Sequence, residues 1–127
     1  MKLRIKGNSV RIRLTKTEVA QFCEQGFYTA ETNFGKTLFR YSVKAGPEAD
    51  SMSAVFEAEE IAIIIPASEL QNWQRDERVG FYDQINLGAD EHLLLQVEKD
   101  FECLEFRGED ESDNYPNPKA QTRATNG

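Results

Sequence analysis

A chain of 127 residues, of which 39% are hydrophobic, is long enough to bury one modest core, so we expect a single domain. Its net charge of -7 at pH 7 argues against nucleic acid as a partner, because neutralising phosphates requires a surplus of Lys and Arg. One histidine and two cysteines are too few for a zinc site or a Cys–His catalytic pair. The sequence shows no signal peptide and no apolar run long enough to cross a bilayer, so we expect a cytoplasmic protein without a membrane partner.

The first segment, residues 2–14, alternates between apolar and polar side chains on both sides of Gly7-Asn8. This period of two predicts a hairpin of two strands joined by a two-residue turn. In that register the apolar residues share one face, with Leu3 opposite Ile12, and the basic residues share the other. Like charges directly opposite each other weaken a sheet unless an anion lies near them. The cations are Lys2, Arg4, Lys6, Arg11 and Arg13, with Arg4 across from Arg11 and Lys2 across from Arg13.

A helix and a second pair of strands follow the hairpin. Thr15 and Glu18 have the spacing of a capping box, in which each residue accepts a hydrogen bond from the backbone of the other, so a short helix is expected to begin there. Two antiparallel strands are then expected within residues 27–44. A two-residue turn between them places Glu31 opposite Arg40, which is a favourable cross-strand pair.

The second half of the chain resembles the first. A shift of 51 positions aligns the first hairpin and the helix with later residues, and three inserted residues then align the second pair of strands with residues 92–101. The chain is therefore predicted to be a duplicated ββαββ unit, with repeats over about residues 1–44 and 52–101. The second helix is expected to begin at Pro66. The aligned positions include Val10 with Ile61, Ile12 with Ile63, and Leu14 with Ile65.

Eight strands and two helices joined by short links predict one α+β domain over residues 1–107. A single open sheet of eight strands would leave two exposed edges. An eight-stranded antiparallel barrel, or a strongly curled sheet, with the two helices packed outside is therefore the expected architecture. Residues 108–127 are acidic and polar with almost no apolar content, and we expect them to form a disordered tail.

Two orientations of the basic face remain open. If the apolar face points inward, the cations form a solvated surface patch. If the helices cover the apolar face from outside, the polar face lines a lumen that suits a phosphoanion with bound Mg²⁺, because cations bind phosphate oxygens and carboxylates hold the metal. The candidate phosphoanion ligands are Arg4, Lys6, Arg11, Arg13 and Arg40, and the candidate metal ligands are Glu98, Asp100 and Glu102.

A duplicated unit with one helix per half and a lumen lined with Arg, Lys and carboxylates resembles the CYTH or triphosphate tunnel metalloenzyme superfamily. The resemblance implies an eight-stranded barrel that binds triphosphates with a metal ion. That family carries Glu-x-Glu-x-Lys on its first strand, whereas this chain has Lys2-x-Arg4-x-Lys6. More closely, residues 1–15 and 97–101 are similar to those of small bacterial proteins known only as domains of unknown function, which implies no activity.

Two functions are compatible with these residues. The first is a non-catalytic binding or interaction module, whose basic strand face pairs with acidic side chains of the same chain or with an acidic protein surface, and whose hairpin edges form a homodimer. The second is binding of a phosphorylated small molecule, a triphosphate or nucleotide, with metal-dependent hydrolysis in the lumen. The first is favoured because a run of charges is more often a solvated or internally paired face than a site.

Overall fold

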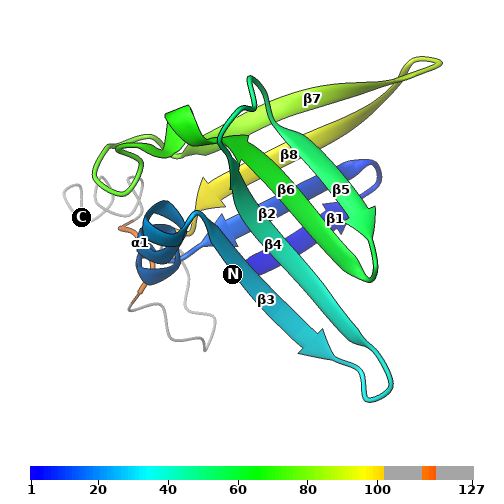
Figure 1. Ribbon diagram of the computed structural model, residues 1–127, viewed down its shortest axis with the longest axis horizontal. Helices are drawn as coiled ribbons and strands as arrows, with labels where there is room; N and C mark the ends of the chain where they lie inside the picture. Colours follow the sequence, from blue (N-terminus) through cyan, green and yellow to red (C-terminus); the bar gives the residue numbers. More distant parts are fainter. Residues whose placement is uncertain (102–112, 117–127) are drawn as a thin grey trace, which may run out of the picture.

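The computed structural model describes residues 1–101 and 113–116 (Figure 1). These residues form eight strands, one α-helix and one turn of 3₁₀ helix. In chain order the elements are β1 (Lys2–Lys6), β2 (Ser9–Leu14), α1 (Lys16–Gln25), β3 (Phe27–Asn33), β4 (Leu38–Gly46), β5 (Ser53–Glu57), β6 (Glu60–Pro66), η1 (Ala67–Leu70), β7 (Gly80–Gly88) and β8 (Glu91–Lys99).

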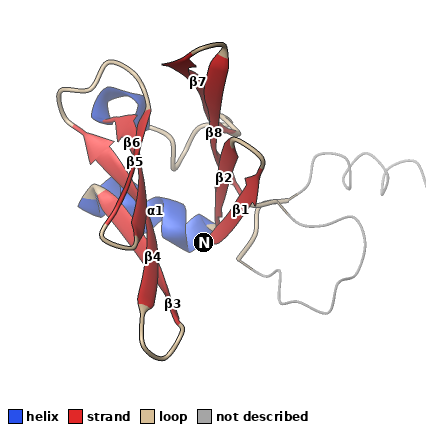
Figure 2. Ribbon diagram, turned by 90° about the vertical axis from the view of Figure 1, so that its right-hand side faces the viewer, coloured by secondary structure: helices blue, strands red, loops and turns tan. Residues whose placement is uncertain are grey.

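The strands form two separate four-stranded sheets. The first sheet has the order β1-β2-β8-β7, and the second has the order β3-β4-β6-β5. Each sheet consists of two antiparallel hairpins, which meet through a parallel pair of inner strands: β2 with β8, and β4 with β6. Figure 2 shows the two sheets facing each other, with α1 lying between them at one end.

The expected single eight-stranded antiparallel barrel, or strongly curled sheet, with two helices packed outside is wrong. Within the described residues, each sheet ends at the outer strand of a hairpin, so the two sheets do not join into a closed structure. Pairing between the hairpins is parallel, not antiparallel, and in both sheets the two inner strands are the second strands of their hairpins. The apolar faces are thus buried by packing the two sheets over one core, and β1, β7, β3 and β5 remain as edge strands.

The core lies between the two sheets. Helix α1 contributes Val19 and Phe22, and the segment after η1 contributes Trp73, whose ring meets that of Phe81 edge-on with 4.8 Å between centroids. Burial of such apolar side chains is the main stabilising contribution to a fold of this size. The core residues are Ile12, Leu14, Val19, Phe22, Val43, Met52, Ile63, Ile65, Leu70, Trp73, Phe81, Leu95 and Val97.

The two connections between the hairpins differ because their first residues differ. The predicted capping box of α1 is confirmed: the Thr15 hydroxyl accepts a hydrogen bond from the amide of Glu18, and the Glu18 carboxylate accepts one from the amide of Thr15. At the corresponding place in the second connection, Pro66 has no side-chain acceptor, and Glu69 forms an ion pair with Arg78 instead. The expected second α-helix is therefore replaced by the single turn η1.

The two parallel ladders have the same register relative to the sequence repeat. Ile12 of β2 pairs with Val97 of β8, and Ile63 of β6 pairs with Val43 of β4. The repeat aligns Ile12 with Ile63, so the two ladders join equivalent positions of the two halves. Each sheet thus combines the first hairpin of one half with the second hairpin of the other. Duplication itself stays a prediction about the origin of the chain.

Residues 113–116 lie against the body of the domain. The side chain of Asp113 accepts a hydrogen bond from the Thr17 hydroxyl at 2.9 Å, next to the N-terminus of α1. The ring of Tyr115 contacts that of Phe101, with 5.6 Å between centroids. The rest of the segment predicted to be a disordered tail lies outside the described residues.

Candidate anion-binding face

The first sheet has an inner face that contributes to the core and an outer face that carries the cations. The predicted register of the first hairpin is confirmed, with Leu3 opposite Ile12 and Arg4 opposite Arg11. Ile12 is fully buried in the core cluster that both sheets share with Val43 and Ile63, so of the two open orientations the structure has the one in which the apolar face points inward. Across β1, β2, β8 and β7 the outer face has three rows: Lys2, Arg13, Glu98 and Gly80; then Arg4, Arg11, Gln96 and Tyr82; then Lys6, Ser9, Leu94 and Gln84.

Glu98 is the counter-ion of Arg11. Its Oε1 lies 2.5 Å from Nε of Arg11, and its Oε2 accepts a hydrogen bond of 2.7 Å from the Tyr82 hydroxyl. Burial and this hydrogen bond raise the pKa of Tyr82 to about 12. The phenol therefore stays protonated at neutral pH, and it fixes one side of a carboxylate that is itself largely buried.

Asp100 is the counter-ion of Arg13 and Lys2 in the adjacent row. Its carboxylate is 2% exposed, with Oδ1 3.7 Å from Nη1 of Arg13 and Oδ2 3.2 Å from Nζ of Lys2. The contact with Lys2 is electrostatic, since Oδ2 has no hydrogen-bond partner of good geometry among the described residues. Two of the three candidate metal ligands are thus placed as counter-ions of cations. The third, Glu102, lies outside the described residues, and no group of three metal-ligating side chains occurs within them.

Arg4 and Lys6 differ from the other three cations of this face. In the described part of the chain neither forms an ion pair with a carboxylate. Both line a surface pocket of about 160 Å³, which also includes Ser9, Arg11 and Gln96 and has no acidic residue in its wall. The structure therefore brings three of the five candidate phosphoanion ligands together, and two of them have no counter-ion within residues 1–101 and 113–116.

The remaining candidates lie elsewhere. Arg13 is on the same face but is directed to Asp100, as described above. Arg40 belongs to β4 of the second sheet, where its Nε is 3.8 Å from the carboxylate of Glu31. This confirms the predicted cross-strand register of Glu31 and Arg40. Arg40 therefore does not contribute to the pocket at Arg4 and Lys6.

Comparison with known proteins assigns the chain to a family without assigning an activity. A family model described as a family of unknown function (DUF7009) matches residues 1–119. The chain belongs to this family. Searches of the curated proteins and of the solved structures find no match. Among the described residues of this family member, no helix is long and apolar enough to cross a membrane.

The sequence analysis did not identify the half of the outer face that β8 and β7 form. A second surface pocket of about 380 Å³ lies over β7 and β8 and is lined by Tyr82, Asp83, Gln84, Leu94, Leu95 and Gln96. Gln96 lines both pockets, so they adjoin each other. The alternation of Leu94, Gln96 and Glu98 along the last strand places them on one face. Only the parallel pairing of β2 with β8 shows that this is also the face of Arg11.

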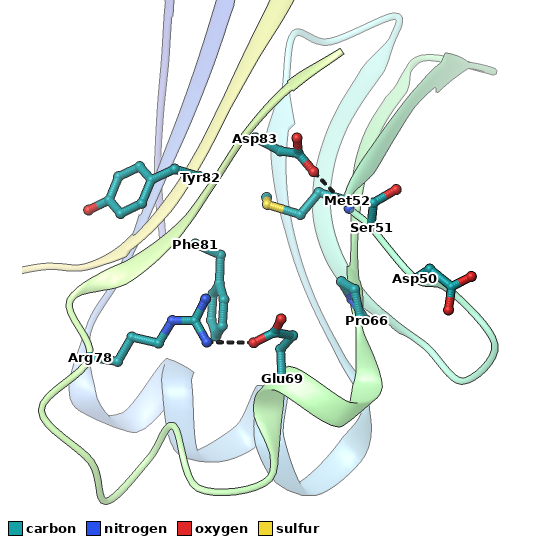
Figure 3. A pocket seen from close by; sticks show the side chains of 9 residues that line it. All are labelled: Asp50, Ser51, Met52, Pro66, Glu69, Arg78, Phe81, Tyr82 and Asp83. Carbon is teal, nitrogen blue, oxygen red and sulfur yellow. Dashed lines mark hydrogen bonds and ion pairs between the residues drawn. The ribbon is translucent and has the colours of Figure 1, made fainter.

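A third pocket, of about 120 Å³, lies between β7, η1 and the loop before β5 (Figure 3). Its cation, Arg78, already has partners: Nη1 is 2.5 Å from Glu69, Nε donates to the carbonyl of Gly80 at 3.2 Å, and the guanidinium lies 4.1 Å from the ring centroid of Phe81. Asp83 accepts a hydrogen bond from the amide of Met52. These contacts join η1 and the second sheet to β7, so we interpret this pocket as structural.

Proposed function

We propose that this protein is a non-catalytic binding module for a phosphoanion, held on the outer face of the first sheet by Arg4, Lys6 and Arg11. The observation that supports this is the pocket of about 160 Å³ with three cations and no carboxylate in its wall. A phosphate group would provide the negative charge that this part of the sheet lacks. Arg is suited to it because the guanidinium donates parallel hydrogen bonds to two oxygens.

The position of the cations argues for a ligand. Arg4 and Arg11 are directly opposite each other in the β1–β2 ladder, and like charges at such positions destabilise a sheet. Glu98 offsets part of this repulsion through Arg11, but no carboxylate of the described residues does so for Arg4 or Lys6. A bound phosphate would contact both sides of the ladder and remove the remaining repulsion.

The site proposed here needs no metal ion. Glu98 and Asp100 already have cations as partners, and the ligand's charge would be met by Arg and Lys side chains. An acidic protein surface would carry the same charge. A concave pocket of this size favours a single compact group such as a phosphate over a broad flat surface.

Calorimetric titration with tripolyphosphate, together with thermal unfolding in its presence, tests the proposal. We expect binding and a raised Tm, because a ligand that binds only the native state stabilises it by mass action. The double variant Arg4→Ala/Lys6→Ala should weaken binding at least about ten-fold, since two charge-assisted contacts are lost. No binding at millimolar tripolyphosphate would overturn the proposal.

The matched control is the double variant Arg40→Ala/Lys44→Ala. It removes the same number of cations from the second sheet, where Arg40 pairs with Glu31 and Lys44 with Glu60. We expect it to bind tripolyphosphate as the unaltered protein does. Equal loss of binding in both double variants would show attraction by net charge alone and would contradict a specific site.

A further inference from the structure

The outer face of the first sheet changes its chemistry halfway across. In the row that begins with Arg4 and Arg11, the next two residues are Gln96 of β8 and Tyr82 of β7. In the row that begins with Lys6 and Ser9, they are Leu94 and Gln84. The β1–β2 side of these two rows therefore carries cations, and the β8–β7 side carries one aromatic ring, one aliphatic side chain and two amides.

The aromatic ring is exposed and held in place. Tyr82 is 56% exposed and Leu94 is 42% exposed, so both present apolar surface to the solvent on this face. The hydrogen bond from the Tyr82 hydroxyl to Glu98 fixes the ring against the sheet, because Glu98 is itself held by Arg11. Figure 3 shows Tyr82 directed away from the pocket at Arg78, toward the strands of the first sheet. A fixed ring loses little conformational entropy when a flat group stacks on it.

The two pockets on this face adjoin each other, because Gln96 lines both of them. Adjacent strands lie about 4.8 Å apart, so the backbones of β1 and β7 are separated by roughly 14 Å at this level. A ligand that fills both pockets must therefore carry a strongly anionic group at one end and a flat group at the other, joined by several bonds.

From this arrangement we infer that the ligand is a nucleotide, with its phosphates against Arg4 and Lys6 and its base against Tyr82 and Leu94. This inference rests on the function proposed above. The amides of Gln84 and Gln96 each present a donor and an acceptor, and the edge of a base offers the complementary groups. An aliphatic phosphate would leave both amides and the exposed ring without partners.

Calorimetry with two probes, ATP and tripolyphosphate, separates the two parts of the site. We expect ATP to bind at least about ten-fold more tightly, because stacking of a base on an aromatic side chain contributes on that scale. In Tyr82→Ala we expect ATP and tripolyphosphate to bind with equal affinity, whatever the loss of the hydrogen bond to Glu98 does to both. Tyr82→Phe keeps the ring and should retain most of the difference between the probes.

The control variant is Phe56→Ala, which removes an exposed aromatic ring from β5 of the second sheet. It should bind both probes as the unaltered protein does. NMR of the unaltered protein gives a readout without mutation: amide shifts that occur with ATP but not with tripolyphosphate should fall on β7 and β8. Shifts of that kind confined to other strands would overturn the inference.

Failure of this inference differs from failure of the proposed function. If tripolyphosphate binds and ATP binds no more tightly, the base has no site, and the phosphoanion module stands without it. If neither probe binds, the proposed function itself is wrong. A single-stranded oligonucleotide that outcompetes ATP at equal nucleotide concentration would overturn the assignment to a free nucleotide.

Discussion

The hairpins β1–β2 and β5–β6 have the same geometry and opposite surface chemistry. Their strands begin 51 residues apart, and each second strand is the inner strand of its sheet, paired in parallel with a neighbour. Their inner faces are both apolar, as Ile12 and Ile63 show. Their outer faces differ at every aligned position: Lys2, Arg4, Lys6, Ser9, Arg11 and Arg13 in the first, and Ser53, Val55, Glu57, Glu60, Ala62 and Ile64 in the second.

The comparison shows that this hairpin geometry does not require the cations. The β5–β6 hairpin reaches the same type of ladder with Val55 opposite Ala62, where the β1–β2 hairpin has Arg4 opposite Arg11. A pair of like charges costs stability at that place, while an apolar pair does not. Residues that a fold does not need, and that reduce its stability, are candidates for function.

The largest expected loss of stability comes from substitutions on the inner faces, and it tests whether the two hairpins contribute equally to the core. Ile12→Ala and Ile63→Ala each remove a fully buried side chain from the core, and each should lower the free energy of unfolding by about 2–5 kcal/mol. Urea denaturation measures both. Val55→Ala, at a partly exposed position of the outer face, is the control and should cost about 1 kcal/mol or less. A cost below 1 kcal/mol for either isoleucine would show that the two hairpins do not contribute equally to the core.

Local structure could be predicted from the sequence because its causes are local. The period of two fixed the register of the β1–β2 hairpin, including Arg4 opposite Arg11. The spacing of Thr15 and Glu18 gave the beginning of α1. The second α-helix was predicted wrongly. Proline is tolerated at the start of a helix, but Pro66 has no side-chain acceptor that could cap the first backbone amides.

The pairing of distant strands could not be predicted in the same way. Nothing in β2 or β8 alone shows that they pair in parallel, since about 80 residues separate them. That pairing brings Glu98 to Arg11 and places Tyr82 and Gln96 in one row with the cations. The cations of the candidate site were therefore found from sequence. Pairing of the basic face with acidic side chains of the same chain was one of the two interpretations of these charges, and it holds for Arg11 and Arg13. The other interpretation took the same carboxylates as metal ligands, and the uncharged half of the face was missed.

A smaller effect is expected when the outer face of the first hairpin is made like that of the second. Arg4→Val introduces the residue of the aligned position, Val55, and should raise the free energy of unfolding by about 1 kcal/mol, because it removes the repulsion with Arg11 and adds a good strand former. The same variant should weaken tripolyphosphate binding. Urea denaturation at low salt and at 1 M NaCl measures the gain and its electrostatic part, which salt screens. A destabilised variant would mean that Arg4 has a structural partner and is not held there for a ligand.

The smallest expected change in the free energy of unfolding comes from the turns of the two hairpins. Gly7 takes a φ of +54° in the first turn at little cost, whereas in the second turn Ala58 and Glu59 take φ of +52° and +58°, a region that residues with a Cβ rarely adopt. Glu59→Gly should therefore raise the free energy of unfolding by about 0.5 kcal/mol, as measured by urea denaturation. Glu59→Ala is the matched control, because it removes the same exposed carboxylate and keeps the Cβ, so it should give no gain. If the two variants are equally stable, the positive φ carries no strain, and the turn of the second hairpin is as favourable as that of the first.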